Sequence, residues 1–242
     1  MNATTDPRPS SVRPDDRPVT LVLASASPAR AATLRAAGVT ARVVVSAVDE
    51  DAVLARAEEV HGSLEPADAA LVLARAKCEE VAARLDVEGG DVDLVVLGCD
   101  SLFEVDGRAY GKPVSAEDAV ARWRAMSGNT GQLHTGHWLI DLRDEEAGGT
   151  GATLGCTVTT EVSFARVGDA EIEAYVATGE PLACAGAFTV DGLGGAFVTG
   201  VRGDHHNVVG LSLPELRVLL AEIGIPWPAL WSSTQTADVL PG

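Results

Sequence analysis

The sequence predicts an α/β fold built on a mixed β-sheet flanked by helices. Apolar runs typical of buried strands alternate with segments of helical period, which is the pattern of βα units. The dipeptide Asp106-Gly107 lies between two strand-like segments and is typical of a tight hairpin, so part of the sheet is predicted to be antiparallel. With 242 residues, 46% hydrophobic and 22% charged, the chain is long enough to bury a sizeable core.

The N-terminal third is predicted to hold two strands and two helices. Val19–Ala24 is an apolar run typical of a buried strand, and Pro28 begins a helix that Gly38 closes. A second strand is predicted over Arg42–Val48. Pro66–Asp86 has a clear helical period, with apolar residues at steps of three and four: Leu71, Ala74, Cys78, Val81 and Leu85.

The middle of the chain predicts a strand, a hairpin and a capped helix. Leu94–Cys99 is a continuous apolar run of the buried-strand type. The hairpin arms are Leu102–Val105 and Arg108–Gly111. Ser115-Ala-Glu-Asp118 is a capping box, and it opens a helix that ends near Gly128.

The C-terminal half continues the alternation of strands and helices. Strands are predicted near Leu133–Leu142 and Thr157–Val167, a helix over about Asp169–Thr178, and two short strands between residues 187 and 201. Ser212-Leu-Pro-Glu215 caps a last helix.

Three segments are predicted to lie outside these elements. The Gly-rich stretch Gly148–Gly155 is a candidate for a long loop or a boundary between lobes. Residues 1–18 contain four prolines and are expected to be a disordered lead-in, and residues 226–242 to form a tail. The folded domain is therefore predicted over residues 19–225.

Composition excludes several classes of function. The chain carries 18 basic and 35 acidic residues, a net charge of -17, which repels phosphate backbones, so no nucleic-acid polymer is expected as a partner. No segment approaches the roughly 20 apolar residues of a membrane-spanning helix, and no signal-type stretch opens the chain. We therefore expect a cytoplasmic protein without membrane contact. The four cysteines form no C-x-x-C pair and are expected to be free thiols.

Lysine is rare in this sequence. Of the 18 basic residues only Lys77 and Lys112 are lysines, and the others are arginines. A compact ammonium placed on a phosphate would explain why two lysines are kept, and chance is the alternative.

Two strand exits carry candidate site residues. Ser25, Ser27 and Arg30 follow the first predicted strand at the start of a helix, where free N–H groups and a cation suit a phosphate, although a plain N-cap is the alternative. Asp100 ends the most apolar strand, where sheet carboxylates commonly meet ligands and metals, with a turn or capping role as the alternative.

Lys112 follows the predicted hairpin within Gly111-Lys112-Pro113. With a two-residue turn, Lys112 lies opposite Ser101, and a strict ladder would put Asp100 on the other face of the sheet. Lys112 and Asp100 can serve one site only if the ladder ends or bulges near Gly111.

The remaining motifs are less specific. The glycines of Ala185–Gly192 would let backbone approach a flat ligand, or would form a string of tight turns. His134 and His137 are not expected to share a metal, because rings three residues apart in a strand point to opposite faces. His205-His206 is predicted to be a polar loop, and the chain lacks the P-loop motif of nucleotide kinases.

Taken in order, a series of short segments resembles the Maf family of nucleoside triphosphate pyrophosphatases. The resemblance covers nearly everything from Val19 to about Ile223, and both lysines fall on lysines of the family pattern. The matching segments are Leu21–Arg30, Ala74–Lys77, Gly98–Ser101, Gly111–Pro113, Ser127-Gly128, Thr135-Gly136, Tyr175–Pro181, Ala185–Phe188 and Asn207–Leu213.

The resemblance implies a two-lobed α/β fold with a cleft between the lobes, and a homodimer. It implies hydrolysis of a nucleoside triphosphate, ribo- or deoxyribo-, to the monophosphate and diphosphate with Mg²⁺ or Mn²⁺ as cofactor. Asp100 matches the catalytic aspartate, assigned as proton acceptor, and with Glu50 is a candidate metal ligand. The phosphate-contacting positions are Ser25, Arg30, Lys77 and Lys112, with Ser27 at the same helix start.

Three residues depart from the family pattern. Ala29 leaves one arginine where the family often has two, and Ser101 replaces a threonine but keeps the hydroxyl. Asp191, next to Gly192 on the expected base side, stands where one branch has a glutamine thought to help select pyrimidines. A carboxylate only accepts hydrogen bonds, whereas an amide also donates.

Two other functions fit the same resemblance. One is a nucleotide-binding regulator of cell division or septum formation with little turnover. The other is an enzyme that removes non-standard nucleotides, which differs from the nucleoside triphosphate pyrophosphatase described above only in its substrate.

Overall fold

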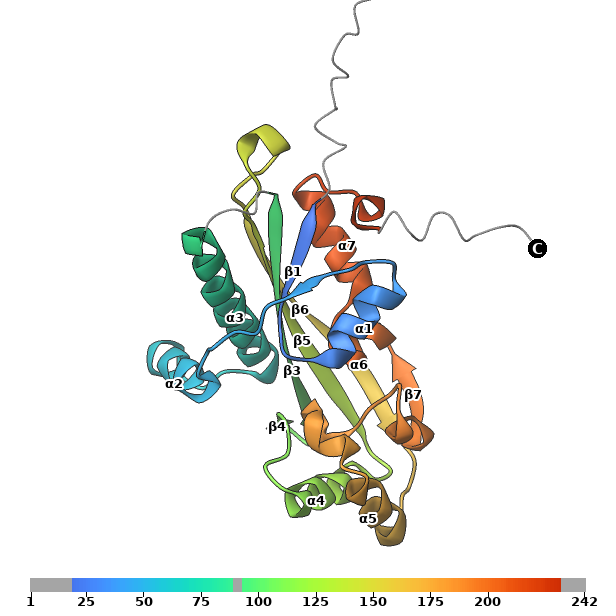
Figure 1. The fold of residues 1–242 in the computed structure, drawn as a ribbon. Helices are drawn as coiled ribbons and strands as arrows, with labels where there is room; N and C mark the ends of the chain where they lie inside the picture. Colours follow the sequence, from blue (N-terminus) through green and yellow to red (C-terminus); the bar gives the residue numbers. More distant parts are fainter. Residues whose placement is uncertain (1–18, 89–92, 232–242) are drawn as a thin grey trace, which may run out of the picture.

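The computed structural model describes residues 19–88 and 93–231, which form one 7-stranded mixed sheet (Figure 1). The strand order is β2-β1-β3-β5-β6-β7, and β4 pairs with β3. β1 pairs with β2 and β3 in parallel, and all other pairs are antiparallel. The strands are β1 Thr20–Ala24, β2 Arg42–Val43, β3 Leu94–Val105, β4 Arg108–Tyr110, β5 Thr130–Asp141, β6 Thr153–Phe164 and β7 Val198–Arg202. The predicted fold class is confirmed.

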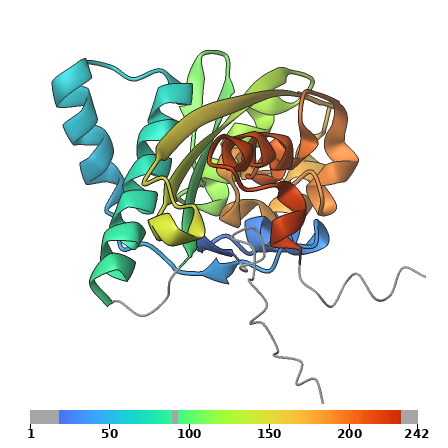
Figure 2. The same cartoon turned by 90° about the horizontal axis from the view of Figure 1, so that it is seen from above.

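Helices cover both faces of this sheet. α3 packs on one face, and α1 and α7 pack on the other (Figures 1 and 2). The α-helices are α1 Pro28–Ala36, α2 Glu50–His61, α3 Pro66–Glu88, α4 Ala116–Met126, α5 Asp169–Ala177, α6 His205–Val209 and α7 Leu213–Glu222. Short 3-10 turns complete the description: η2 Glu145–Ala147, η3 Glu180–Ala183, η4 Ala185–Ala187, η5 Leu193–Phe197 and η6 Trp227–Leu230.

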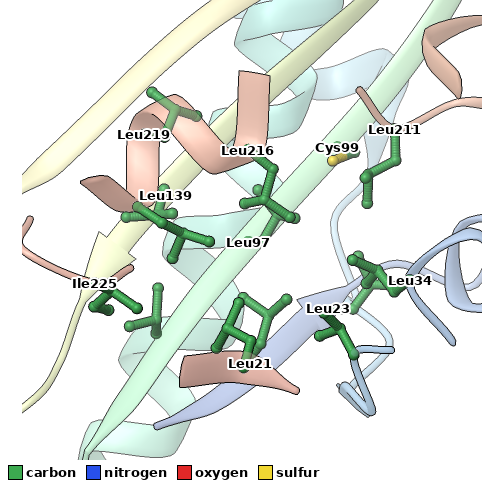
Figure 3. Packing of buried hydrophobic residues seen from close by; sticks show 14 of the residues in the cluster. Leu21, Leu23, Leu34, Leu97, Cys99, Leu139, Leu211, Leu216, Leu219 and Ile225 are labelled. Atoms are coloured by element: carbon green, nitrogen blue, oxygen red, sulfur yellow. The ribbon is translucent and has the colours of Figure 1, made fainter. Parts of the chain in front are cut away.

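The core divides the molecule into two lobes. In the lobe that contains β1, Leu97 of β3 packs with Leu21 and Leu216 on the α7 face (Figure 3), and Val96 packs with Val81 on the α3 face. In the other lobe a second cluster centres on aromatic residues from β3, α4 and α5. The long strands β3, β5 and β6 run through both lobes, so one continuous sheet joins them.

Glycines allow α3 to lie unusually close to the sheet. A Cβ added at Gly98 would lie 2.2 Å from the carbonyl oxygen of Ala74, and one at Gly136 would lie 2.4 Å from that of Ala70. Real Cβ atoms do not approach so closely, so only glycine fits at either position. The close approach brings the next turn of α3, with Lys77, over β3.

The predicted helix starts are confirmed by their caps. The hydroxyls of Ser27, Ser115 and Ser212 accept hydrogen bonds from the backbone N–H groups three residues further on. Each satisfies a donor that the first helical turn leaves unpaired. The hairpin at Asp106-Gly107 is also confirmed, with Val105 opposite Arg108.

Two strand predictions are wrong in length. β2 stops at Val43 instead of Val48, because its partner β1 ends at Ala24 and the chain then binds α3 side chains, with Ala47 donating to Glu80. Leu94–Cys99 and Leu102–Val105 form one continuous strand, β3, because β5 pairs with it across the polar residues between them.

The Gly-rich segments are also organised differently. One strand, β7, replaces the two predicted between residues 187 and 201, and the rest of that stretch forms 3-10 turns. The stretch Gly148–Gly155 is not a lobe boundary, because it joins β5 to β6 at one end of the sheet and β6 already begins at Thr153. His205-His206 opens the short helix α6 and is not a loop.

α2 is a second α-helix, besides α6, that the sequence did not reveal. Its sequence has no apolar period, and none of its residues is buried. Its one clear signal is the Asp49 cap, whose side chain accepts a hydrogen bond from the backbone N–H of Ala52.

The predicted C-terminal tail lies partly within the described residues. Residues 226–231 belong to the fold, since Leu230 lies in the core and Trp231 bridges to Val39. The predictions for residues 1–18 and 232–242 lie outside the described residues. The four cysteines are free thiols, as predicted. Among the described helices, none has the length and apolar character needed to cross a bilayer.

The close contact of α3 with the sheet predicts a stability effect. Gly98→Ala should lower the free energy of unfolding by about 1–3 kcal/mol, because the new methyl forces backbone to shift in a packed layer. Gly200→Ala is the control, since a Cβ there meets its nearest atom at 3.9 Å. Urea unfolding measures both, and equal stability of the two variants would contradict the packing argument.

Candidate active site

One stretch of β3 has a described strand on only one of its two edges. Along one edge β3 pairs with β5 over residues 95–104, and the other edge is shared by β1, which ends opposite Gly98, and β4, which begins opposite Phe103. No described strand pairs with Cys99–Leu102 on that second edge. We call these four residues the open edge, and Asp100 and Ser101 lie in it on opposite faces of the sheet.

The α3 face of the open edge carries a buried ion pair. The Lys77 ammonium lies 2.5 Å from a carboxylate oxygen of Asp100 and 2.7 Å from one of Glu50, at the start of α2. The side chains of Lys77 and Asp100 are each 12% exposed, whereas that of Glu50 is 54% exposed. Three residues that the sequence singled out therefore meet at one point.

Burial controls the acidity of Asp100. Removal from water raises the pKa of its carboxyl group above the ordinary value, and the cations of Lys77 and Arg30 oppose that rise. The negative charge of Glu50 adds to the rise. A carboxylate whose pKa is raised but whose charge is partly compensated is suited to accept a proton near neutral pH.

The opposite face is organised by the buried guanidinium of Arg30. Nε donates to the carbonyl oxygen of Gly210 at 2.6 Å, Nη1 donates to Ser25 at 2.9 Å and to the carbonyl oxygen of Cys99 at 2.7 Å, and Nη2 donates to Ser101 at 3.0 Å. Arg30 thus supplies the open edge with the hydrogen bond that a neighbouring strand would otherwise make. Of its five N–H groups, one on Nη2 is left over.

This network continues into β5 and α6. The Ser101 and Thr135 hydroxyls lie 2.9 Å apart, and Thr135 donates to the carbonyl oxygen of Asn207 at 3.1 Å. The Asn207 side-chain nitrogen in turn lies within hydrogen-bond distance of three oxygens of β5 and β6, including the hydroxyl of Thr160. Sequence reasoning gave Thr135 and Asn207 no role, although both lie in segments that match the family.

Ser27 and Lys112 lie just beyond β1 and β4, the two strands that flank the open edge. Ser27 caps α1 and accepts from the Arg30 backbone, so its hydroxyl is partly used as the N-cap alternative foresaw. The β3–β4 ladder ends at Tyr110, which meets the condition for Lys112 and Asp100 to serve one site. Lys112 is exposed, and its ammonium has no hydrogen-bond or ion-pair partner within residues 19–88 and 93–231.

Asp191 and Gly192 lie in an exposed loop that Glu180 holds. The Glu180 carboxylate accepts hydrogen bonds from the hydroxyls of Tyr175 and Thr189 and from the backbone of Leu193 and Gly194. Although burial acts to raise the pKa of Glu180, these four donors hold it below its ordinary value. The structure does not bring Asp191 into contact with Asp100 or Lys77.

A different group of side chains has the composition of a metal site. Ligand atoms of Asp204, His205 and His206 lie within 4.8 Å of one another. His137 stands apart from them: burial and the nearby Arg30 lower its pKa to about 4, and its Nε2 accepts from the backbone of Ser212. His134 has different hydrogen-bond partners from His137, since its ring nitrogens contact Glu104 and Thr159.

Together these features define an α/β protein in which two largely buried cationic side chains, Lys77 and Arg30, flank an open strand edge from opposite faces of the sheet. Comparison with known proteins identifies the family: the model of the family described as "Maf-like protein" matches residues 20–223. A "Nucleoside triphosphate pyrophosphatase" of Leifsonia xyli subsp. xyli is 53% identical over 212 residues, 88% of this chain and 96% of its own. One of Salinispora tropica is 48% identical over 226 residues, 93% of each chain. The chain belongs to the Maf-like family.

A solved structure gives a weaker match. A nucleoside-triphosphatase / dITP/XTP pyrophosphatase from Mycobacterium abscessus aligns with 92% of this chain and 98% of its own. Its identity of 14% and TM-score of 0.34 are too low to indicate a shared fold.

The electrostatics of Asp100 make a direct prediction. With ¹³C-labelled aspartate, the Asp100 carboxyl resonance, assigned by its loss in Asp100→Asn, should titrate with a pKa above 3.8. In Lys77→Met that pKa should rise further, because the cation that favours the charged form is gone.

Arg75→Met is the matched control, since this exposed arginine of α3 pairs with Glu79 and not with Asp100. A wild-type pKa at or below 3.8, or a fall in Lys77→Met, would contradict the electrostatic account.

Proposed function

We propose that this protein hydrolyses nucleoside triphosphates between the α- and β-phosphates, releasing the nucleoside monophosphate and inorganic diphosphate. The observation that carries the proposal is the buried Lys77–Asp100 pair at an open strand edge, with Arg30 on the other face of that edge, where it binds Cys99 and Ser101. The names of the relatives, which are 53% and 48% identical, support the same reaction.

Asp100 is proposed as the proton acceptor. Burial keeps its basicity above that of an ordinary aspartate, and Lys77 keeps it ionised, so it can take a proton from a water that attacks the α-phosphorus. The cost of ionising a buried carboxylate is reduced by the cation in direct contact with it.

The phosphate chain is proposed to lie along the open edge. Lys77 and Lys112 would neutralise phosphate oxygens, and Ser25, Ser27 and the free N–H groups at the start of α1 would donate to them. Arg30 would reach a phosphate only through its remaining N–H, and its larger task would be to fix Ser25 and Ser101. Since the net charge is -17, attraction of the anionic substrate must come from these local cations.

Asp100 and Glu50 fit a divalent cation. Their carboxylate oxygens already converge on one cation, the Lys77 ammonium, and Mg²⁺ and Mn²⁺ prefer oxygen ligands of this kind. Such an ion would take the place of the Lys77 ammonium between the two carboxylates, leave Lys77 to the phosphates, and supply charge neutralisation and polarisation of phosphate oxygens. On the base side we propose Asp191 and Gly192, where a carboxylate would favour a base that presents hydrogen-bond donors.

The reaction can be tested on a panel of common and modified nucleoside triphosphates with Mg²⁺ or Mn²⁺, assaying monophosphate and diphosphate. Asp100→Asn should lower turnover about 10²–10⁴-fold, because an amide cannot accept the proton. Asp169→Asn is the control, since this exposed carboxylate pairs with Arg124 on the surface.

Each outcome separates the candidate functions. Monophosphate plus diphosphate, lost in Asp100→Asn and kept in Asp169→Asn, supports the proposal, and the fastest substrate separates common from non-standard nucleotides. Binding of triphosphates without turnover would contradict it and favour a nucleotide-binding regulator.

A further inference from the structure

The loop that carries Lys112 is fastened to the helix α4 behind it. Nη1 of Arg122 donates to the carbonyl oxygen of Gly111 at 2.6 Å, and Nη2 donates to that of Lys112 itself at 3.3 Å. The Arg122 side chain is 10% exposed. One planar guanidinium therefore binds the carbonyl oxygens of the two peptide groups on either side of the Lys112 Cα.

Asp118, one turn earlier on α4, completes this fastening. Its Oδ2 accepts from Nη2 of Arg122 at 2.6 Å and from the backbone N–H of Val114 at 3.0 Å. The guanidinium also stacks over the ring of Tyr110, with its carbon 5.0 Å from the ring centroid. Arg122 and Asp118 thus hold both ends of the segment from Gly111 to Val114.

The Lys112 side chain, in contrast, forms no hydrogen bond or ion pair with the residues that the structure describes. It is exposed, and its ammonium has no partner in the part of the chain that the structure describes. The side chain is flexible, so the region that the ammonium can reach is set by where the backbone places its Cα. That placement depends on Arg122, on Asp118 and on Gly186, whose N–H also donates to the carbonyl oxygen of Gly111.

We propose that Arg122 is a positioning residue for Lys112, and that the Arg122–Asp118 pair sets the distance between the Lys112 ammonium and the substrate phosphates. The inference rests on the proposed function, in which Lys112 contacts phosphate. Arg122 itself is buried under the loop and would not touch the substrate.

The first test compares kcat/KM for the best triphosphate in three variants. Arg122→Ala should lower kcat/KM about 10–100-fold, because a displacement of the order of 1 Å at a charged contact has effects of that size. Arg122→Lys should lose nearly as much, since one ammonium cannot bind two carbonyls and a carboxylate as a planar fork does. Arg124→Ala, on the exposed side of the same helix, is the matched control and should change little.

The decisive measurement is a double-mutant cycle with Lys112→Ala. If Arg122 acts through Lys112, adding Arg122→Ala to Lys112→Ala should lower kcat/KM by less than threefold further, and free guanidinium should partly restore Arg122→Ala only while Lys112 is present. Losses that simply multiply, or full activity of Arg122→Lys, would overturn the inference.

Folding and function are checked in the same experiment. Circular dichroism shows whether each variant is folded, and Asp118→Asn, which removes only one side of the fastening, replaces Arg122→Ala in the cycle if that variant does not fold. A wild type without turnover would overturn the proposed function and the inference with it. If turnover depends on Lys112, but the effects of Arg122 and Asp118 do not depend on the presence of Lys112, the inference is overturned and the proposed function stands.

Discussion

The structure depends on one constraint, which is that a single strand has two different partners along one edge. β3 pairs with β1 in one lobe and with β4 in the other, and the two partners leave Cys99–Leu102 uncovered between them. Side chains alternate along β3, so this open edge presents Asp100 to α3 and Ser101 to α1. A ligand at the edge can therefore meet groups from both faces of the sheet, which a fully paired strand would not allow.

The charges at the open edge are arranged for chemistry more than for stability. Asp100, Lys77 and Arg30 are largely buried, and the loss of hydration of buried charges offsets most of what their attraction contributes. Arg30 compensates by satisfying backbone oxygens of Cys99 and Gly210, which would otherwise lie unpaired. Gly210 has a φ of +118° and would hold a Cβ 3.1 Å from Arg30, so the approach of that carbonyl requires glycine.

Sequence reasoning found the elements whose signals are local and missed those that depend on partners. The serine caps and the Asp106-Gly107 turn are fixed by neighbouring residues, and all were predicted. The length of β3 could not be predicted from the sequence, because Asp100 and Ser101 interrupt its apolar pattern. Pairing with β5 holds these two residues in the strand. For the site, the rarity of lysine pointed to Lys77 and Lys112, but nothing local showed that Arg30 would be buried or that α4 would reach the Lys112 loop.

The central claim is that the phosphates of the substrate lie along the open edge, between the Lys77–Asp100 side and the Ser25–Arg30 side. A crystal structure of Asp100→Asn with a triphosphate analogue that resists cleavage between the α- and β-phosphates, and with Mg²⁺, tests it directly. We expect phosphate oxygens within hydrogen-bond distance of Ser25 and Lys77, with the β- or γ-phosphate near Lys112. A nucleotide bound away from residues 99–102, or one that places its base and not its phosphates next to position 100, would contradict this arrangement.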